Sequence, residues 1–169
     1  NLHFLDRLSD DWVNEQLDNP EAKGLTDMLL AEFPWQTFST LTTAEVASPE
    51  RMKGIVAKTF NRPCMRGVKY FWVLEPFKGR DGVHAHVLSK SEPPEHSWRE
   101  TWRWYFEKRK FGRFQSLPIE KTPGRFFKVA AYLAKYAAKT VNVTRQNSEW
   151  GFGGAFLRGR PGQLHLSAL

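Results

Sequence analysis

The chain has 169 residues, 25 of them basic and 18 acidic, with a net charge of +7 and a pI near 9.7. This length suits one domain of ordinary size, and a hydrophobic fraction of 41% is enough for a packed core, which excludes a disordered tail. The basic excess favours an anionic partner. The sequence has no apolar run of membrane-spanning length and no signal-peptide pattern, so we expect a cytoplasmic protein. The single cysteine, Cys64, excludes an internal disulfide and a cysteine-rich zinc site.

The first 33 residues are acidic, whereas the rest of the chain is strongly basic. They hold eight acidic and two basic residues. Helical spacing of apolar residues predicts one helix, and Asn19-Pro20 separates it from a second short helix. The residues with this spacing are Leu2, Leu5, Leu8 and Trp12. We therefore predict an acidic helical appendage over 1–33, which shields the basic surface or simply packs on it, a main domain over 34–157, and a basic flexible tail over 158–169.

From Pro34 onward, the pattern alternates between strands and helices. The β-branched and aromatic stretch 35–43 predicts a strand. Ser48-Pro49-Glu50 has the residue types of a helix start, and this helix extends to about Phe60. The further elements are strands over 70–77 and 83–89 joined by a glycine-bearing loop, a helix over 97–108, a strand over 113–120, a helix over 124–140, and a strand or loop from 150. This order predicts an α+β fold with helices packed on a central antiparallel sheet of about five strands.

Two histidines lie two positions apart in the second strand of the predicted hairpin. His84 and His86 therefore share one face of the sheet, and Val83, Ala85 and Val87 share the other. Glu75 ends the apolar part of the preceding strand, and a loop of two or four residues would place it opposite a histidine, whereas a three-residue loop would not. Two imidazoles and one carboxylate leave coordination positions open, as in catalytic metal sites. Exposed strand histidines beside an ion-paired glutamate are the alternative.

Two tyrosines lie one turn apart on the helix predicted over 124–140. The spacing of Tyr132 and Tyr136 brings their Cβ atoms to about 5 to 6 Å. Nearby ammonium groups favour the phenolate, which is the nucleophilic form, and attract phosphate. An ordinary amphipathic helix with solvated lysines is the alternative. The lysines on this side are Lys128, Lys135 and Lys139, and the predicted buried stripe consists of Phe126, Ala130, Leu133 and Ala137.

Three segments resemble, in order, the motifs of the HUH endonucleases, and within them of the rolling-circle replication initiator (Rep) proteins. Residues 38–43 look like the first motif, a strand of the central sheet. Residues 82–88 are similar to the two-histidine metal motif, with Ala85 in place of its bulky hydrophobic residue. Residues 132–139 are similar to the third motif, in which each of two tyrosines is followed three places later by lysine.

The resemblance implies an RRM-like HUH fold and an enzyme that nicks single-stranded DNA at a replication origin with Mg²⁺ or Mn²⁺. A tyrosine would attack the phosphodiester, form a 5′-phosphotyrosine and leave a 3′-OH that primes synthesis and later reseals the strand. The resemblance also implies a plasmid- or phage-encoded protein of a bacterial or archaeal cell, with host helicase and polymerase as further partners. The catalytic residues would be Tyr132, Tyr136, Lys135 and Lys139, and the metal ligands His84, His86 and, from its strand position, Glu75.

A second nucleic-acid signal lies between the metal motif and the tyrosines. The stretch 98–114 interleaves aromatic and basic residues, a mixture that stacks on unpaired bases and follows a phosphate backbone. Some of these aromatics must face the core, and we expect Trp102 or Tyr105 to be buried. The side chains expected to reach DNA are Lys128, Arg103, Lys108, Arg109, Lys110 and Arg113.

Three alternatives remain at the level of sequence. A two-tyrosine HUH transposase or a plasmid relaxase would share the first chemical step, although relaxases usually have a third histidine where Glu75 stands here. A non-haem iron oxygenase could use two histidines and a carboxylate, but it needs no lysine-flanked tyrosine pair. An RRM-like nucleic-acid-binding domain without catalysis would bind without metal and form no covalent adduct.

Overall fold

The computed structural model describes residues 7–60, 65, 67–90, 114–119, 123–138 and 150–154. Within them, five strands form one antiparallel sheet and four α-helices flank it, which confirms the predicted α+β class. The helices are α1 (Asp10–Leu17), α2 (Pro20–Ala31), α3 (Pro49–Phe60) and α5 (Pro123–Ala138), and the strands are β1 (Thr37–Leu41), β2 (Lys69–Pro76), β3 (Val83–Lys90), β4 (Phe114–Pro118) and β5 (Trp150–Gly154).

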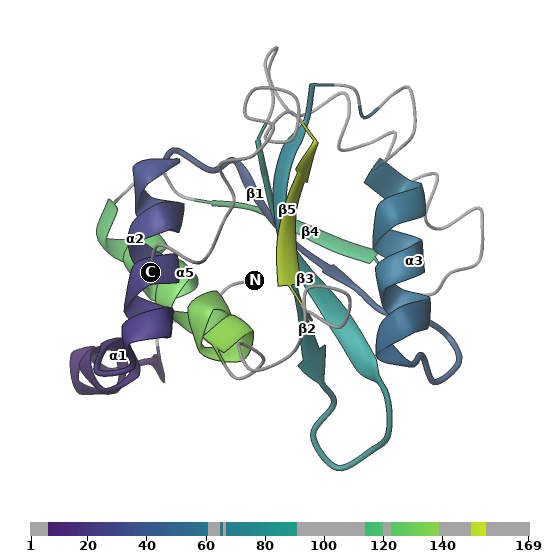
Figure 1. The fold of residues 1–169 in the computed structure, drawn as a ribbon, viewed down its shortest axis with the longest axis horizontal. Coiled ribbons are helices and arrows are strands. Elements are labelled where there is room, and N and C mark those ends of the chain that lie inside the picture. The colour runs from purple at the N-terminus through teal and green to yellow at the C-terminus, as the bar shows by residue number, and fades with distance from the viewer. Residues whose placement is uncertain are drawn as a thin grey trace.

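The sheet separates two layers of helices. Its strand order is β4-β1-β3-β2-β5, so the predicted histidine strand β3 is central. Helices α1, α2 and α5 lie on one side of the sheet and α3 lies on the other (Figure 1). Side chains alternate between the two faces along each strand, and each face therefore has its own core.

The larger core lies between the sheet and the α2–α5 pair. The stripe predicted on α5 is buried, as are Val129, Ala131 and Ala134 beside it. Helix α2 contributes Ala22, Leu25 and Leu29 to the same cluster, so part of the acidic N-terminal segment packs into this core. The boundary placed between residues 33 and 34 stays a prediction. The sheet side of the core consists of Phe38, Phe71, Val73 and Leu88.

The second core lies under α3. The ring of Phe60 stacks on that of Tyr70 with centroids 3.8 Å apart. The start of α3 agrees with the sequence pattern, because Pro49 is its first residue and the Ser48 hydroxyl accepts a hydrogen bond from the Arg51 amide. The buried residues of α3 in this cluster are Met52, Ile55, Val56 and Phe60.

The predicted start of the first helix is wrong. Helix α1 begins at Asp10, and Leu8 precedes it instead of lying on its apolar face. The physical reason is a cap: the Ser9 hydroxyl accepts a 3.1 Å hydrogen bond from the Trp12 amide and ends the helix on its N-terminal side. The break between the two helices is as expected, because Asn19 caps α2 and Pro20 is its first residue.

Several predictions lie outside the described residues. They concern Cys64, the helix over 97–108, the basic and aromatic stretch up to residue 113, and the tail over 158–169. Strand β4, at Phe114–Pro118, lies within the predicted range 113–120. The strand or loop expected from residue 150 is a strand, β5.

The β2–β3 hairpin has the register that the metal prediction requires. Glu75 is directly opposite His84, and Val73 is opposite His86. The Phe77 amide donates to the Gly82 carbonyl, so four residues, 78–81, form the tip of the hairpin. Gly82 has φ of +93°, and a Cβ at this position would lie 3.0 Å from Val46 Cγ1, so only glycine fits well. The even loop length predicted from the sequence is confirmed.

Candidate active site

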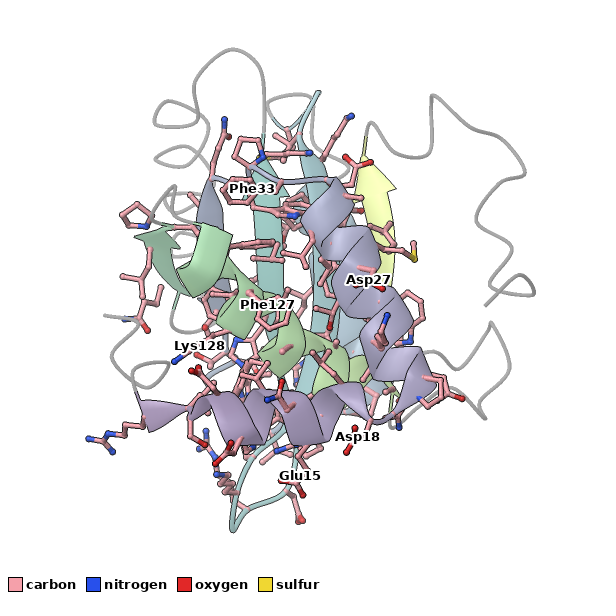
Figure 2. All side chains as sticks on the ribbon, turned by 90° about the vertical axis from the view of Figure 1, so that its left-hand side faces the viewer. Glu15, Asp18, Asp27, Phe33, Phe127 and Lys128 are labelled. Atoms are coloured by element: carbon pink, nitrogen blue, oxygen red, sulfur yellow. The ribbon has the colours of Figure 1, made fainter. Side chains whose placement is uncertain are left out.

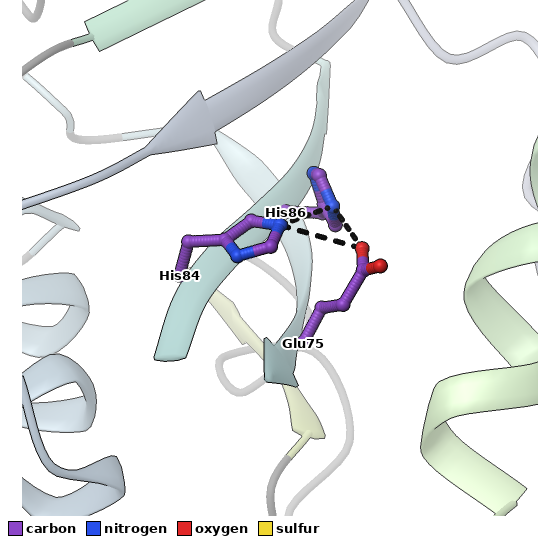
Figure 3. A group of neighbouring side chains, drawn as sticks. All are labelled: Glu75, His84 and His86. Carbon is purple, nitrogen blue, oxygen red and sulfur yellow. Dashed lines mark hydrogen bonds and ion pairs between the residues drawn. The ribbon is translucent and has the colours of Figure 1, made fainter. Parts of the chain in front are cut away.

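Glu75, His84 and His86 converge on the α5 side of the sheet (Figure 3). His86 Nε2 lies 2.6 Å from Glu75 Oε2, and His84 Nε2 lies 3.4 Å from the same oxygen. The two Nε2 atoms are 3.1 Å apart. One atom from each of three side chains therefore points to a common centre.

The donor set and its spacing fit a divalent metal ion. With bonds of about 2.1 Å, two ligands at right angles lie about 3 Å apart, close to the separations of His84 Nε2 from its two partners. The 2.6 Å contact between His86 and Glu75 is a hydrogen bond that opens slightly when both atoms bind a metal. Two imidazoles and one carboxylate suit several divalent ions, and a site with three protein ligands leaves positions for substrate.

The carboxylate is buried but stays ionised. Only 8% of the Glu75 side chain is exposed. Burial alone would raise its pKa, but hydrogen bonds from His84, His86 and Tyr136 and the charge of His86 outweigh burial and hold the pKa far below its ordinary value of 4.5. Burial lowers the pKa of His86, so a neutral imidazole lies beside a negative carboxylate. The site therefore presents a net negative charge to a cation.

The two histidine rings are held in different ways. His86 Nδ1 lies 3.1 Å from the Thr40 hydroxyl, and the Phe38 ring packs 5.1 Å from the His86 ring. The His84 ring packs against Phe77 at 4.7 Å. Among the described side chains, His84 Nδ1 is buried without a hydrogen-bond partner. These contacts were not found from the sequence, because they depend on the β1–β3 register and on the hairpin turn.

Helix α5 places both tyrosines at this cluster. The Tyr132 hydroxyl donates a 2.9 Å hydrogen bond to Glu75 Oε2, and its ring lies 6.0 Å from that of His86. Tyr136 also hydrogen-bonds the carboxylate, and the two tyrosine rings are 5.2 Å apart. The helix pattern explains this placement: with the apolar stripe on the sheet, the next positions around the helix reach its edge. Metal cluster and tyrosines therefore share one site.

The tyrosine pKa values differ from the sequence-based expectation. Lysines were expected to favour the phenolate, but burial and the negative charge of Glu75 raise the pKa of Tyr132 well above its ordinary value of 10.0. Burial and the hydrogen bond to Glu75 raise the pKa of Tyr136 to about 12. Without a cation at Glu75, both tyrosines are therefore neutral phenols at physiological pH.

The lysines of α5 are partly engaged by the N-terminal helix, which lies across α5 (Figure 2). Lys128 Nζ donates to the Leu8 carbonyl at 2.9 Å and lies 3.5 Å from Asp10 Oδ1. Lys135 Nζ lies 5.3 Å from the centre of the Trp12 ring and 5.6 Å from that of Tyr136. The other basic residues predicted for catalysis or DNA binding lie outside the described part of the chain: Lys139, Arg103, Lys108, Arg109, Lys110 and Arg113.

The fold and this site define a class: α+β domains in which two histidines and a carboxylate on central strands face tyrosines of a covering helix. The family model of the replication-associated protein ORF2 matches residues 36–141, which include every element from β1 to α5. The chain therefore belongs to the replication-associated protein ORF2 family, consistent with a Rep protein of rolling-circle replication. No curated protein and no solved structure matched the chain. No helix in the described ranges is both long and apolar enough to cross a bilayer.

Proposed function

We propose that this protein is a metal-dependent endonuclease and strand transferase that nicks single-stranded DNA at a replication origin through a tyrosine. Family membership supports a role in the initiation of replication. The observation that carries the chemistry is the 2.9 Å contact between the Tyr132 hydroxyl and Glu75 Oε2, the oxygen that both histidine Nε2 atoms face. A potential nucleophile and a potential metal centre are thus in direct contact.

Glu75, His84 and His86 would hold the metal. When bound, Mg²⁺ or Mn²⁺ would supply Lewis-acid activation of the scissile phosphate. The negative charge of Glu75, which raises the pKa of both tyrosines, is then offset by a cation, so a tyrosine loses its proton more readily. Metal dependence and nucleophile activation are therefore two results of one charge balance.

The proposed reaction is a transesterification. A tyrosine oxygen attacks the phosphorus in line, the bond from phosphorus to the 3′-oxygen breaks, and a proton completes the free 3′-OH. The new bond joins the tyrosine to the 5′-phosphate, so the energy of the phosphodiester is kept and a later 3′-OH can reseal the strand by the reverse exchange without ATP. A second tyrosine allows a second cut while the first still holds DNA.

Basic side chains complete the proposal. Lys135 lies beside Tyr136 and would neutralise the phosphate or the phenolate together with Lys139. Lys128 would contact the DNA backbone, as would the predicted residues of the stretch 98–114. The match to a replication-associated family favours an initiator over a transposase or relaxase.

The test is detection of the covalent intermediate. A library of single-stranded oligonucleotides with a 3′ fluorophore is incubated with the protein and Mn²⁺, because a 5′-phosphotyrosine retains the 3′ portion of the strand. We expect a fluorescent protein band resistant to denaturation, and a DNA-linked peptide within residues 126–139 in mass spectra. Sequencing of the captured DNA would identify the preferred site.

Two controls make this test decisive. EDTA and the double variant Tyr132→Phe, Tyr136→Phe should each prevent the adduct, while the double variant still binds DNA. An adduct that survives either control, or that maps to another residue, contradicts the proposal.

A further inference from the structure

We propose that Thr40 is a positioning residue of the metal centre, which holds the ring of His86 and sets which ring nitrogen carries the proton. This inference rests on the proposed function, because it assigns a role within the same metal site. Thr40 lies on β1 directly opposite His86 on β3. Its hydroxyl oxygen is 3.1 Å from His86 Nδ1.

The two nitrogens of His86 have separate partners. Nε2 faces the cluster, 2.6 Å from Glu75 Oε2 and 3.1 Å from His84 Nε2. Nδ1 faces away from the cluster, toward Thr40. The ring can therefore bind a metal through Nε2 without breaking its contact with Thr40.

A hydroxyl suits this position because it can donate or accept a hydrogen bond. A neutral imidazole carries one N–H. Without metal, Nε2–H donates to Glu75, and Nδ1 accepts from the Thr40 hydroxyl. When a metal takes the Nε2 lone pair, the N–H must be at Nδ1, which then donates to the Thr40 oxygen. Such outer partners orient histidine ligands and raise their basicity.

His84 provides an internal contrast. Its Nδ1 has no hydrogen-bond partner among the described residues, and its ring is packed against Phe77. Of the two imidazoles, only His86 has its tautomer controlled by a described side chain at Nδ1. Loss of the Thr40 hydroxyl should therefore weaken metal binding without altering the rest of the cluster.

The experiment compares Mn²⁺ affinity of the full chain, without DNA, among Thr40→Val, Thr40→Ser and the wild type, by calorimetry or by the signal of free Mn²⁺ in electron paramagnetic resonance. Valine keeps the shape of threonine but has no hydroxyl, and serine keeps the hydroxyl. We expect about 10-fold to 100-fold weaker binding for Thr40→Val and near wild-type binding for Thr40→Ser. Thr59→Val is the matched control, because it removes a buried hydroxyl, bonded to the Ile55 carbonyl, on α3.

A second readout reports on the tautomer. In ¹⁵N-labelled protein with Mg²⁺, we expect the His86 proton at Nδ1 in the wild type and in Thr40→Ser. Equal Mn²⁺ affinity of Thr40→Val and the wild type, or equal weakening by valine and serine, would overturn the role of Thr40 and leave the proposed nuclease intact. A wild type that binds no Mn²⁺ would overturn the metal centre itself, and this inference with it.

Discussion

Tyr132 and Glu75 are 57 positions apart in the chain, yet the tyrosine hydroxyl donates a 2.9 Å hydrogen bond to the carboxylate oxygen. The contact joins α5 to β2 across the edge of the larger core. Because Glu75 also accepts from both histidines, one buried oxygen links the two motifs that the sequence shows separately. Its environment suggests four experiments.

The two tyrosines should differ in the first cut. The Tyr132 hydroxyl is 2.9 Å from the oxygen shared by the histidines, so Tyr132→Phe should reduce the initial covalent adduct to background. Tyr136→Phe should retain most of it, because the hydroxyl of Tyr132 remains in place. Single-turnover labelling with 3′-tagged DNA measures both, and a greater loss for Tyr136→Phe would reverse the assignment.

Metal binding should stabilise the fold only when the histidine pair is intact. Ligand at 100 times its Kd stabilises a protein by about 2.7 kcal/mol. We therefore expect Mn²⁺ to raise the Tm of the wild type, with EDTA reversing the shift, and to leave the Tm of His86→Ala unchanged. Glu45→Ala serves as control, since Glu45 is an exposed carboxylate paired with Arg51 away from the cluster. An equal shift in His86→Ala would place the ion elsewhere.

Glu75 should make the stability of the metal-free protein depend on acid pH. Its folded-state pKa lies below the ordinary value of 4.5, so its contribution is fully present above pH 4.5 and is lost as pH falls through the folded value. Urea unfolding between about pH 2.5 and 6 should show a decrease in the free energy of unfolding toward low pH. Glu75→Gln should flatten this dependence, and an identical slope in both proteins would contradict the ionised state of Glu75.

The lysines of α5 can be tested through salt. Removing one phosphate contact to single-stranded DNA should reduce the slope of log K against log salt by about 0.7. We expect this change for Lys135→Met and for Lys128→Met, and none for Lys23→Met, because Lys23 pairs with Asp27 on the exposed side of α2. An unchanged slope for Lys128→Met would mean that its contacts with Leu8 and Asp10 persist on DNA.

Much of the fold follows from local sequence patterns. Period-two alternation identified the hairpin, and Ser48-Pro49 identified the start of α3, because both signals act over a few residues. The strand order could not be predicted, since it depends on which apolar faces fit together in space. The start of α1 was misplaced because apolar spacing was given more weight than the cap at Ser9.

The candidate site was predicted in its residue types but not in its contacts. Strand parity brought Glu75 and the histidines to one face, and helical spacing brought the tyrosines together. Thr40 was part of a recognised strand motif, but its contact with His86 requires the β1–β3 register. The sign of the tyrosine pKa shift could not be predicted, because burial and a carboxylate from β2 outweigh the lysines on the same helix.

The turn between Pro76 and Val83 has a consequence for how this chain tolerates insertions and deletions. Removing one residue from 77–82 would exchange the two faces of β3, so that the imidazoles would face α3 and the valines would face α5. Adding or removing two residues would keep each side chain on its present face. The length of this connection can therefore change only in even steps, and its tip is a suitable place for an inserted pair of reporter residues.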